Sequence, residues 1–219
     1  MQMIFQDPYE SLNPRWTIKD IIKEPLDIHN IGSLSEREDA IVEILRTVGL
    51  TPPENYLSRY PHEISGGQRQ RVSIARTLVM KPKFVVCDEP TSMLDVSIRI
   101  SIMDLMLSLA KELEVSYLYI THDLAVARYM CNRIAVMFNG KIVEIGDTED
   151  LLQNPVHPYT KRLISSIPIP DPTYKREQYK VNFDELDNII SKNPNEKMVD
   201  IGGGHLVATH DTKDFLIES

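Results

Sequence analysis

The sequence is poor in cysteine and has no long apolar run. Its 219 residues include two cysteines, Cys87 and Cys131, which lie far apart and lack the spacing of metal ligands. A reducing, cytosolic setting is the default for such a chain. No apolar stretch approaches the roughly 20 residues that a membrane-spanning helix needs. The opening MQMIFQDPYE is not a signal peptide, because no positively charged segment precedes an apolar one. If the protein works at a membrane, we expect it to do so through partners.

Basic residues are also fewer than acidic residues. The chain has 24 Lys and Arg against 32 Asp and Glu, which gives a formal net charge of -8. Proteins bind the phosphate backbone of nucleic acids with clustered Lys and Arg. This composition therefore weighs against a nucleic-acid partner, whereas the apolar fraction of 42% fits a soluble globular domain.

The motif G-x-x-x-x-G-K-[ST] occurs nowhere in the sequence. In nucleotide-binding proteins this loop surrounds phosphates with backbone N–H groups, and its Lys neutralises their charge. The glycine run Gly202–Gly204 is not followed by Lys and Ser or Thr, so it is no phosphate loop. Internal repeats and low-complexity tracts are absent as well.

Hydrophobic periodicity predicts helices in the first part of the chain. A short strand at Met3–Phe5 comes first, and a helix over Thr17–Glu24 should stop at Pro25. In the next helix, Glu36–Val48, we expect Ser35 and Glu38 to form a capping box and Gly49 to follow the C-terminal end. A further helix should begin after Ser65, with Gln68 as the partner of this cap, and end at Lys81-Pro82.

From residue 84 onward, strands and helices alternate. The apolar run Phe84–Cys87 is typical of a strand buried on both faces. The alternation predicts an α/β fold with a largely parallel sheet, and Asn139-Gly140 predicts a hairpin. From about residue 150 the chain becomes Pro-rich and then polar, which we interpret as an extension. The elements expected after the first strand are Val96–Leu113, Ser116–Thr121, Asp123–Met130, Arg133–Phe138 and Lys141–Ile145.

Asp88 and Glu89 follow the predicted strand Phe84–Cys87 directly. Ligands of open α/β sheets bind beyond the carboxyl ends of parallel strands. Paired carboxylates there suit metal-assisted phosphoryl chemistry, one holding Mg²⁺ and the other orienting a water. A solvated turn that ends the strand explains Asp-Glu-Pro equally well. His122 follows the strand Ser116–Thr121 and should reach the same edge, although a lone histidine there is more often structural.

Ser65, Gly66, Gly67 and Gln68 begin a predicted helix. A capping hydroxyl and glycines leave backbone N–H groups aimed outward at the positive end of the helix dipole, which is a ready anion site. Taken alone, this segment is better explained as an ordinary capped helix.

Taken together, these segments resemble the ABC ATPase family. ISGGQRQRVSIAR, FVVCDEPTSMLD and YITHDL stand in the order and at the spacing of its signature, its Walker B motif with the D-loop, and its switch-histidine segment. Gln6 in IFQDPYESLNPR resembles the Q-loop glutamine. The resemblance covers about residues 1–150. It implies an ATPase with a P-loop NTPase-like fold, in which a largely parallel sheet is joined by a helical subdomain at about 17–64.

The resemblance also implies roles for individual residues, with ATP and Mg²⁺ as cofactors. Glu89 would be the general base and Asp88 the Mg²⁺-associated carboxylate. Gln6 would sense Mg²⁺ and the γ-phosphate, and His122 would contact the γ-phosphate.

A second group of residues would act across a dimer. Ser65, Gly66, Gly67 and Gln68 would grip ATP held by the opposite, head-to-tail subunit. Asp95 would lie at the dimer seam, where the family more often has SALD in place of this chain's SMLD.

Two further segments resemble the oligopeptide/dipeptide importers, a group that includes nickel importers: FQDPYESLNPR and NPVHPYTKRLISSIP. The implied partners are two transmembrane permease subunits and, indirectly, an extracytoplasmic peptide-binding protein, but no nucleic acid. The implied location is peripheral, at the cytoplasmic face of the cell membrane. Residues 151–219 would form a C-terminal extension, without the cysteine cluster that many relatives carry there.

The family places its phosphate loop and a central strand upstream of the Q-loop. Because Gln6 is so near Met1, we expect an ATPase domain at 1–150 that is incomplete at its N-terminus and lacks the Walker A part. A catalytically inactive fragment or regulatory binding module of the same family is the alternative. An ABC ATPase acting on DNA or ribosomes is disfavoured by the acidic charge and by the NPVHPYT segment.

Overall fold

The structure, a computed structural model, describes residues 1–166 and 197–209. The chain divides into two compact units, Met1–His122 and Asp123–Ser219. The sheet of the first unit is parallel and that of the second is antiparallel. Within the described ranges, no helix is both long and apolar enough to cross a membrane. The expected boundary near residue 150 stays a prediction.

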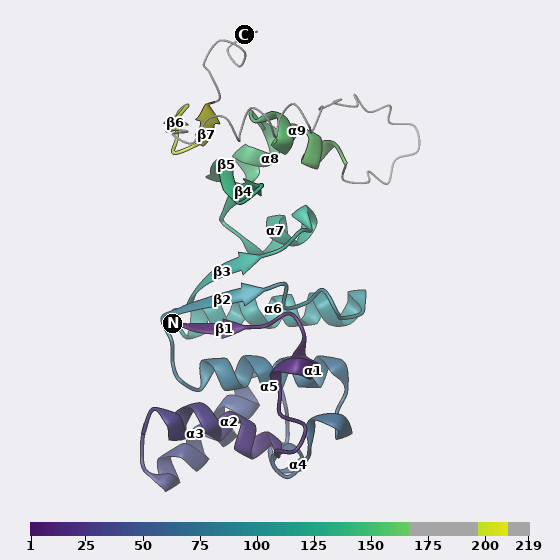
Figure 1. Ribbon diagram of the computed structural model, residues 1–219. Helices are drawn as coiled ribbons and strands as arrows, with labels where there is room; N and C mark the ends of the chain where they lie inside the picture. Colours follow the sequence, from purple (N-terminus) through teal and green to yellow (C-terminus); the bar gives the residue numbers. More distant parts are fainter. Residues whose placement is uncertain (167–196, 210–219) are drawn as a thin grey trace. The chain divides into compact units, whose positions relative to one another are not determined.

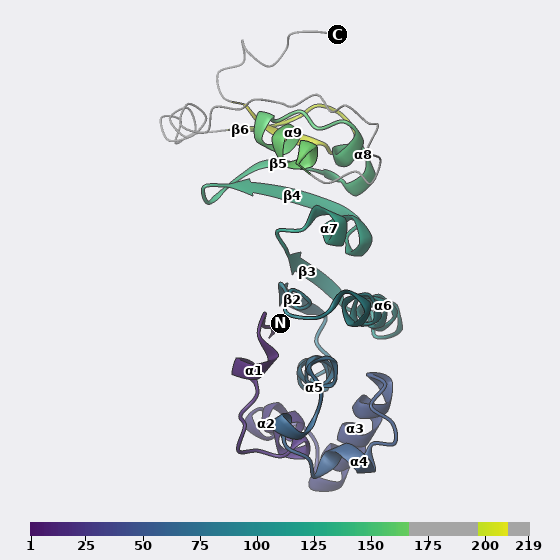
Figure 2. The ribbon, with the colours of Figure 1, turned by 90° about the vertical axis from the view of Figure 1, so that its right-hand side faces the viewer.

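The first unit contains a small sheet and a group of helices (Figure 1). Helix α5 contacts both β1 and α6, and helices α2, α3 and α4 gather beyond α5, away from the sheet (Figures 1 and 2). Its elements are β1 (Gln2–Ile4), α1 (Pro8–Ser11), α2 (Ile18–Ile28), α3 (Leu34–Thr47), α4 (Glu54–Leu57), the 3-10 turn η1 (Pro61–Glu63), α5 (Gly66–Leu78), β2 (Phe84–Asp88), α6 (Val96–Glu112) and β3 (Ser116–Ile120).

The three strands are parallel in the order β1-β2-β3, which confirms the predicted α/β class. Ile4 and Cys87 are register partners on the buried face, and neither is exposed to solvent. On the other face Met3 and Leu118 are 38% and 51% exposed. The prediction that Phe84–Cys87 is buried on both faces is therefore wrong for the described residues. Its apolar composition could not show which face the helices cover.

Helix α2 continues past the proline that was expected to end it. Thr17 and Asp20 form a capping box at its start, and the helix runs to Ile28 with Pro25 inside. Leu26, directly after the proline, is 2% exposed. Burial of Leu26 favours continuing the helix and offsets the backbone hydrogen bond that proline cannot make.

Helix α3 begins two residues earlier than expected. Its capping box is made by Ser33 and Glu36, not by Ser35 and Glu38. Glu38 instead forms an ion pair with Lys19 of α2, with 2.6 Å between Oε1 and Nζ. The ion pair between α2 and α3 thus uses the Glu38 side chain, which the local sequence had predicted to be part of the cap.

The second unit has a four-stranded antiparallel sheet in the order β4-β5-β7-β6. The predicted strand Arg133–Phe138 and its hairpin are confirmed, but the strand pairs antiparallel with β5 and does not extend the parallel sheet. Strands β6 and β7 lie where the sequence showed little periodicity. The elements are α7 (Leu124–Met130), β4 (Arg133–Phe138), β5 (Lys141–Asp147), α8 (Thr148–Gln153), α9 (Pro158–Ser165), β6 (Lys197–Asp200) and β7 (Leu206–Thr209).

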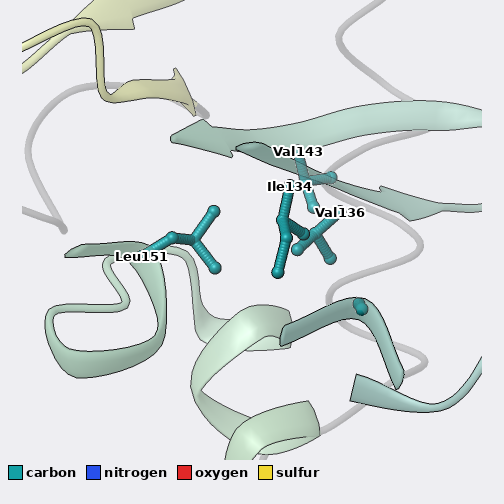
Figure 3. Close-up of a cluster of buried hydrophobic side chains, with 5 residues drawn as sticks. Ile134, Val136, Val143 and Leu151 are labelled. Atoms are coloured by element: carbon teal, nitrogen blue, oxygen red, sulfur yellow. The ribbon is translucent and has the colours of Figure 1, made fainter. Parts of the chain in front are cut away.

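The core of this unit is a small apolar cluster. Ile134 and Val136 of β4, Val143 of β5 and Leu151 of α8 converge there (Figure 3), and Ala127 of α7 completes the cluster. Parts of the predicted extension, residues 167–196 and 210–219, lie outside the described residues.

Candidate functional site

The three parallel strands end at one edge of the sheet, and a candidate residue follows each end. Gln6 lies two residues after β1, Glu89 directly after β2, and His122 two residues after β3. Such an edge is where open α/β sheets bind ligands. All three residues belong to the first unit, Met1–His122.

Glu89 is the centre of this group. Its Oε2 accepts a hydrogen bond of 3.0 Å from Gln6 Nε2, and its Oε1 lies 2.7 Å from His122 Nδ1. The Glu89 side chain is 20% exposed and the His122 side chain 75% exposed. The structure therefore brings together three side chains that are far apart in sequence, and it leaves the group open to solvent on the histidine side.

The Glu89 backbone is held in an unusual conformation. Its φ is 42°, in the left-handed region that residues with a Cβ seldom adopt. The Glu89 N–H donates to Ile120 O at 3.0 Å, and its carbonyl accepts from Ser92 N at 3.1 Å. Such strain costs on the order of 1–3 kcal/mol and is concentrated at functional sites. The fixed backbone aims this carboxylate toward Gln6 and His122.

Ser92 is a member of the site that the sequence analysis did not select. Its hydroxyl donates to the Glu89 carbonyl at 3.0 Å and accepts from Gln6 Nε2 at 3.4 Å. Thr91, 3% exposed, anchors the same turn through its hydroxyl, 3.1 Å from Tyr119 Oη. The available signal was the hydroxyl pair directly after Pro90, since such residues bond to nearby backbone in turns.

Asp88 is the last residue of β2 and lies opposite Ile120 in the register. It is half-buried on the less covered face of the sheet. Carboxylate and amide oxygens are suitable Mg²⁺ ligands, and sites of one or two carboxylates are commonly completed by substrate phosphates. Across the described ranges, no three His, Cys, Asp or Glu side chains are grouped to hold a metal ion. Asp88 and Gln6 therefore fit a magnesium ion only as part of a larger ligand set.

The N-terminus of α5 forms a second group. Ser65 is the N-cap, and its capping box with Gln68 is complete: Gln68 Oε1 accepts from Ser65 N at 3.0 Å, and Ser65 Oγ accepts from Gln68 N at 3.4 Å. Gln68 Nε2 also donates to Tyr56 Oη at 3.4 Å. The Gln68 side chain is thus engaged within its own subunit.

The two glycines of α5 differ in what surrounds them. A Cβ on Gly67 would lie 2.7 Å from Ile98 Cγ2 of α6, so close packing requires glycine there. A Cβ on Gly66 would lie 3.8 Å from Leu94 Cδ2, an ordinary contact. Packing within the chain therefore explains Gly67 but not Gly66.

Asp95 is the N-cap of α6, and its side chain makes no capping hydrogen bond. It is exposed, as is Met93 at 62%. Because a Cβ on Gly66 would lie 3.8 Å from Leu94 Cδ2, the beginning of α5 and the segment before α6 lie side by side. The predicted place of Asp95 at a dimer seam stays a prediction.

Comparisons with known proteins agree on a family. The family model described as "ABC transporter" matches residues 1–92, and the model described as "Oligopeptide/dipeptide transporter, C-terminal region" matches residues 143–191. Among solved structures, the chain resembles cbiO1 from Clostridium perfringens, part of the ABC transporter complex cbiONQ. The TM-score is 0.61 and the identity 28%, over 70% of this chain and 59% of that one.

Curated relatives are more similar. The oligopeptide transport ATP-binding protein OppF of Bacillus subtilis (strain 168) is 48% identical over 208 residues, which are 94% of this chain and 68% of the relative. The dipeptide transport ATP-binding protein DppF of Lactococcus lactis is 48% identical over 207 residues, 94% of this chain and 65% of the relative. The chain thus spans about two thirds of the length of these relatives. It belongs to the ABC transporter family, among the oligopeptide and dipeptide transport ATP-binding proteins.

Proposed function

We propose that this chain carries the hydrolytic half of an ATP site and energises the import of oligopeptides or dipeptides. The observation that carries the proposal is the convergence of Gln6, Glu89 and His122 at one sheet edge. Its support from relatives is the 48% identity to transport ATP-binding proteins for oligopeptides and dipeptides.

Glu89 would act as the general base. An ionised carboxylate has about four lone-pair directions, so the bonds from Gln6 and His122 leave each oxygen able to accept from a water. Because the Glu89 carboxylate only accepts, Nδ1 of His122 carries the proton of their contact, and this fixes the ring's orientation. A water bound to Glu89 would give a proton to the carboxylate as it attacks the γ-phosphorus of ATP, and the bond from that phosphorus to the ADP oxygen would break.

The other residues would hold the substrate. When bound, ATP supplies the γ-phosphoryl group, and Mg²⁺ offsets its charge. Asp88 and the Gln6 amide oxygen would bind the magnesium ion, and His122 would reach the γ-phosphate. A G-x-x-x-x-G-K-[ST] loop, which the 219 residues do not include, would provide the cation and the N–H donors for the remaining phosphate charge.

The N-terminus of α5 would serve the partner subunit. Ser65, Gly66, Gly67 and Gln68 would face ATP bound to a second subunit arranged head to tail, and Asp95 would lie at the seam. This role explains a glycine at 66 that packing within the chain does not require, since backbone N–H groups at a helix start bind anions best without a side chain in the way.

The closing and opening of the two head-to-tail subunits would be transmitted to two transmembrane permeases. The helices between Gln6 and Ser65 would transmit this movement. An extracytoplasmic peptide-binding protein would deliver the peptide, and this chain would act at the cytoplasmic face of the membrane.

Steady-state ATP hydrolysis tests the proposal. The measurement uses the chain fused to a family segment that supplies the G-x-x-x-x-G-K-[ST] loop, here named the loop-bearing fusion. Glu89→Gln should lower turnover by about 10²-fold or more, the effect expected of a positioned base. The matched control is Glu112→Gln, the same change at an exposed residue that ends α6. Turnover of Glu89→Gln within about threefold of the control would reject Glu89 as the base, because it is far below the effect of a positioned base.

A further inference from the structure

The second unit buries a carboxylate that the proposed function does not use. Glu144 of β5 is 0% exposed. Its oxygens accept hydrogen bonds from the backbone N–H groups of Val156 and His157, at 2.8 and 3.0 Å. The third partner is His205, whose Nε2 lies 2.7 Å from Glu144 Oε1. One buried side chain therefore joins β5, the connection between α8 and α9, and the residue that precedes β7.

His205 faces a carboxylate with each ring nitrogen. Besides the contact of Nε2 with Glu144, its Nδ1 lies 3.2 Å from Asp150 Oδ2. The histidine is 3% exposed, so water has little access to the ring. Ionised carboxylates only accept hydrogen bonds, and a neutral imidazole carries one N–H. With both carboxyl groups ionised, the two contacts are satisfied together only when the ring carries two protons and a positive charge.

Few backbone pairs attach the hairpin of β6 and β7 to the rest of the second unit. Strand β7 pairs with β5 at two positions, Glu144 with Val207 and Ile145 with Leu206. The turn between β6 and β7 is made by Gly202–Gly204, all with positive φ, and it delivers His205 into the interior. The glycine run thus forms a hairpin turn, and the side chain of His205 is a main tie between the hairpin and α8.

The other polar and charged groups nearby do not replace this charge. Arg133 of β4 donates to the Gly204 carbonyl at 3.5 Å. The Nδ1 of His157 accepts from Tyr159 N at 3.2 Å as the cap of α9. Asp150 also accepts from Asn154 Nδ2 at 3.0 Å, through its other oxygen. A doubly protonated His205 would therefore be the cation between Glu144 and Asp150 among these contacts.

We propose that His205 is a proton-controlled latch for the hairpin formed by β6 and β7. With two protons, His205 holds Glu144 and Asp150 at once and fixes the hairpin to the body of the second unit. With one proton, it keeps the bond to the buried Glu144 and presents a lone pair to the Asp150 carboxylate. That contact then turns repulsive, the buried Glu144 loses its counter-charge, and the hairpin opens more often. Glu144 and Asp150 lie within residues 143–191, the region matched by the transporter C-terminal model, and His205 lies beyond it.

Two measurements on the 219-residue chain test the latch. The first is ¹⁵N NMR of histidine-labelled protein, in which the His205 signals are assigned from their loss in His205→Gln. The second is amide hydrogen exchange of Leu206–Thr209, corrected for intrinsic rates, from about pH 5 to about pH 9. The control is His29→Gln, the same change at an exposed histidine of the first unit.

At the acidic end of this range, both ring nitrogens of His205 should be protonated and β7 should be protected. Protection should fall as the ring loses a proton. His205→Gln should exchange about tenfold faster or more at the acidic end, with little further dependence on pH. Asp150→Asn should flatten the pH dependence while the fold is kept, because an amide can face either form of the ring.

A bare ring nitrogen across the whole range would overturn the proposal, as would protection of β7 that does not change with the protonation of His205. If His205→Gln unfolds the second unit, the ring-nitrogen signals are assigned from the Asp150→Asn spectrum. Exchange of β7 that depends on pH in the parent chain but not in Asp150→Asn then supports the latch. Equal pH dependence in the two proteins overturns it.

Discussion

Glu89 is held by its left-handed backbone and by the contacts of its carboxylate with Gln6 and His122. Its type and its position after an apolar strand predicted the right sheet edge. The sequence could not show the left-handed backbone at 42° or the two side chains that hold the carboxylate. These depend on Gln6 and His122, whose approach is set by strand register and not by local pattern. Ser92 escaped selection for the same reason, because its partners include a residue 86 positions away.

We expect the Ser92 hydroxyl to hold Gln6 and the Glu89 backbone in place. In the loop-bearing fusion, Ser92→Ala should lower kcat roughly two- to tenfold, because each lost hydrogen bond contributes ~0.5–1.5 kcal/mol. KM for ATP should change little, since Ser92 bonds to Glu89 and Gln6 and not to substrate in this account. Steady-state kinetics would measure both quantities.

Ser92→Thr is the matched control, as it keeps a hydroxyl that can donate to the Glu89 carbonyl. It should retain most of the activity. Loss of activity in both variants would indicate that the turn responds to size and not to the hydroxyl, and the positioning role would then be wrong.

At the scale of elements, the sequence predicted most helices and strands but not all of their ends. Two capping boxes two residues apart, Ser33 with Glu36 and Ser35 with Glu38, fit the start of α3 equally well by motif. Glu38 pairs with Lys19 and not with Ser35, so the capping box that forms is that of Ser33 and Glu36. Tertiary contacts also carry α2 through Pro25. Local rules cannot weigh such contacts.

Ser33→Ala should destabilise the fold by about 1 kcal/mol, the usual effect of losing an N-cap. Ser35→Ala should change the unfolding free energy much less, because Ser35 is exposed inside the helix. Urea unfolding of the 219-residue chain, followed by circular dichroism, compares the pair. Equal losses in the two variants would contradict the observed helix start.

The contact between α5 and α6 allows a second matched pair. Gly67→Ala would bring a Cβ to 2.7 Å from Ile98 Cγ2 and should destabilise by ~1–3 kcal/mol, as overpacking does. Gly66→Ala should be neutral or slightly stabilising, because its Cβ has room and alanine favours helix. Thermal unfolding would show the difference, and a larger loss for Gly66→Ala would contradict the packing.

At the scale of the whole chain, alternating strands and helices predicted the α/β class, but the second sheet was not foreseen. Strands β4 and β5 were expected as a hairpin, but the four-stranded sheet also requires β7, which begins 59 residues after β5 ends. Leu206–Thr209 has no strong strand pattern. Its place is set by pairing with β5 and by the buried bond between His205 and Glu144. Long-range pairing of this kind leaves little trace in local periodicity.

In the proposed function, the two clusters of the first unit are halves of one ATP site shared by two subunits. Residues Gln6, Glu89 and His122 would hold ATP of their own subunit, and the N-terminus of α5 would face the ATP of the partner. Gly66 is the sharpest probe of this arrangement, because a Cβ there would make an ordinary contact with Leu94 and no clash within the chain.

Light scattering of the loop-bearing fusion that carries Glu89→Gln measures ATP-dependent dimerisation and so tests the shared site. Without hydrolysis, MgATP should convert the protein from monomer to dimer. Adding Gly66→Asp should keep it monomeric, because a carboxylate would lie where the N–H groups would meet phosphate. A dimer that forms equally well with Gly66→Asp would show that this helix start does not face nucleotide, and it would contradict the account.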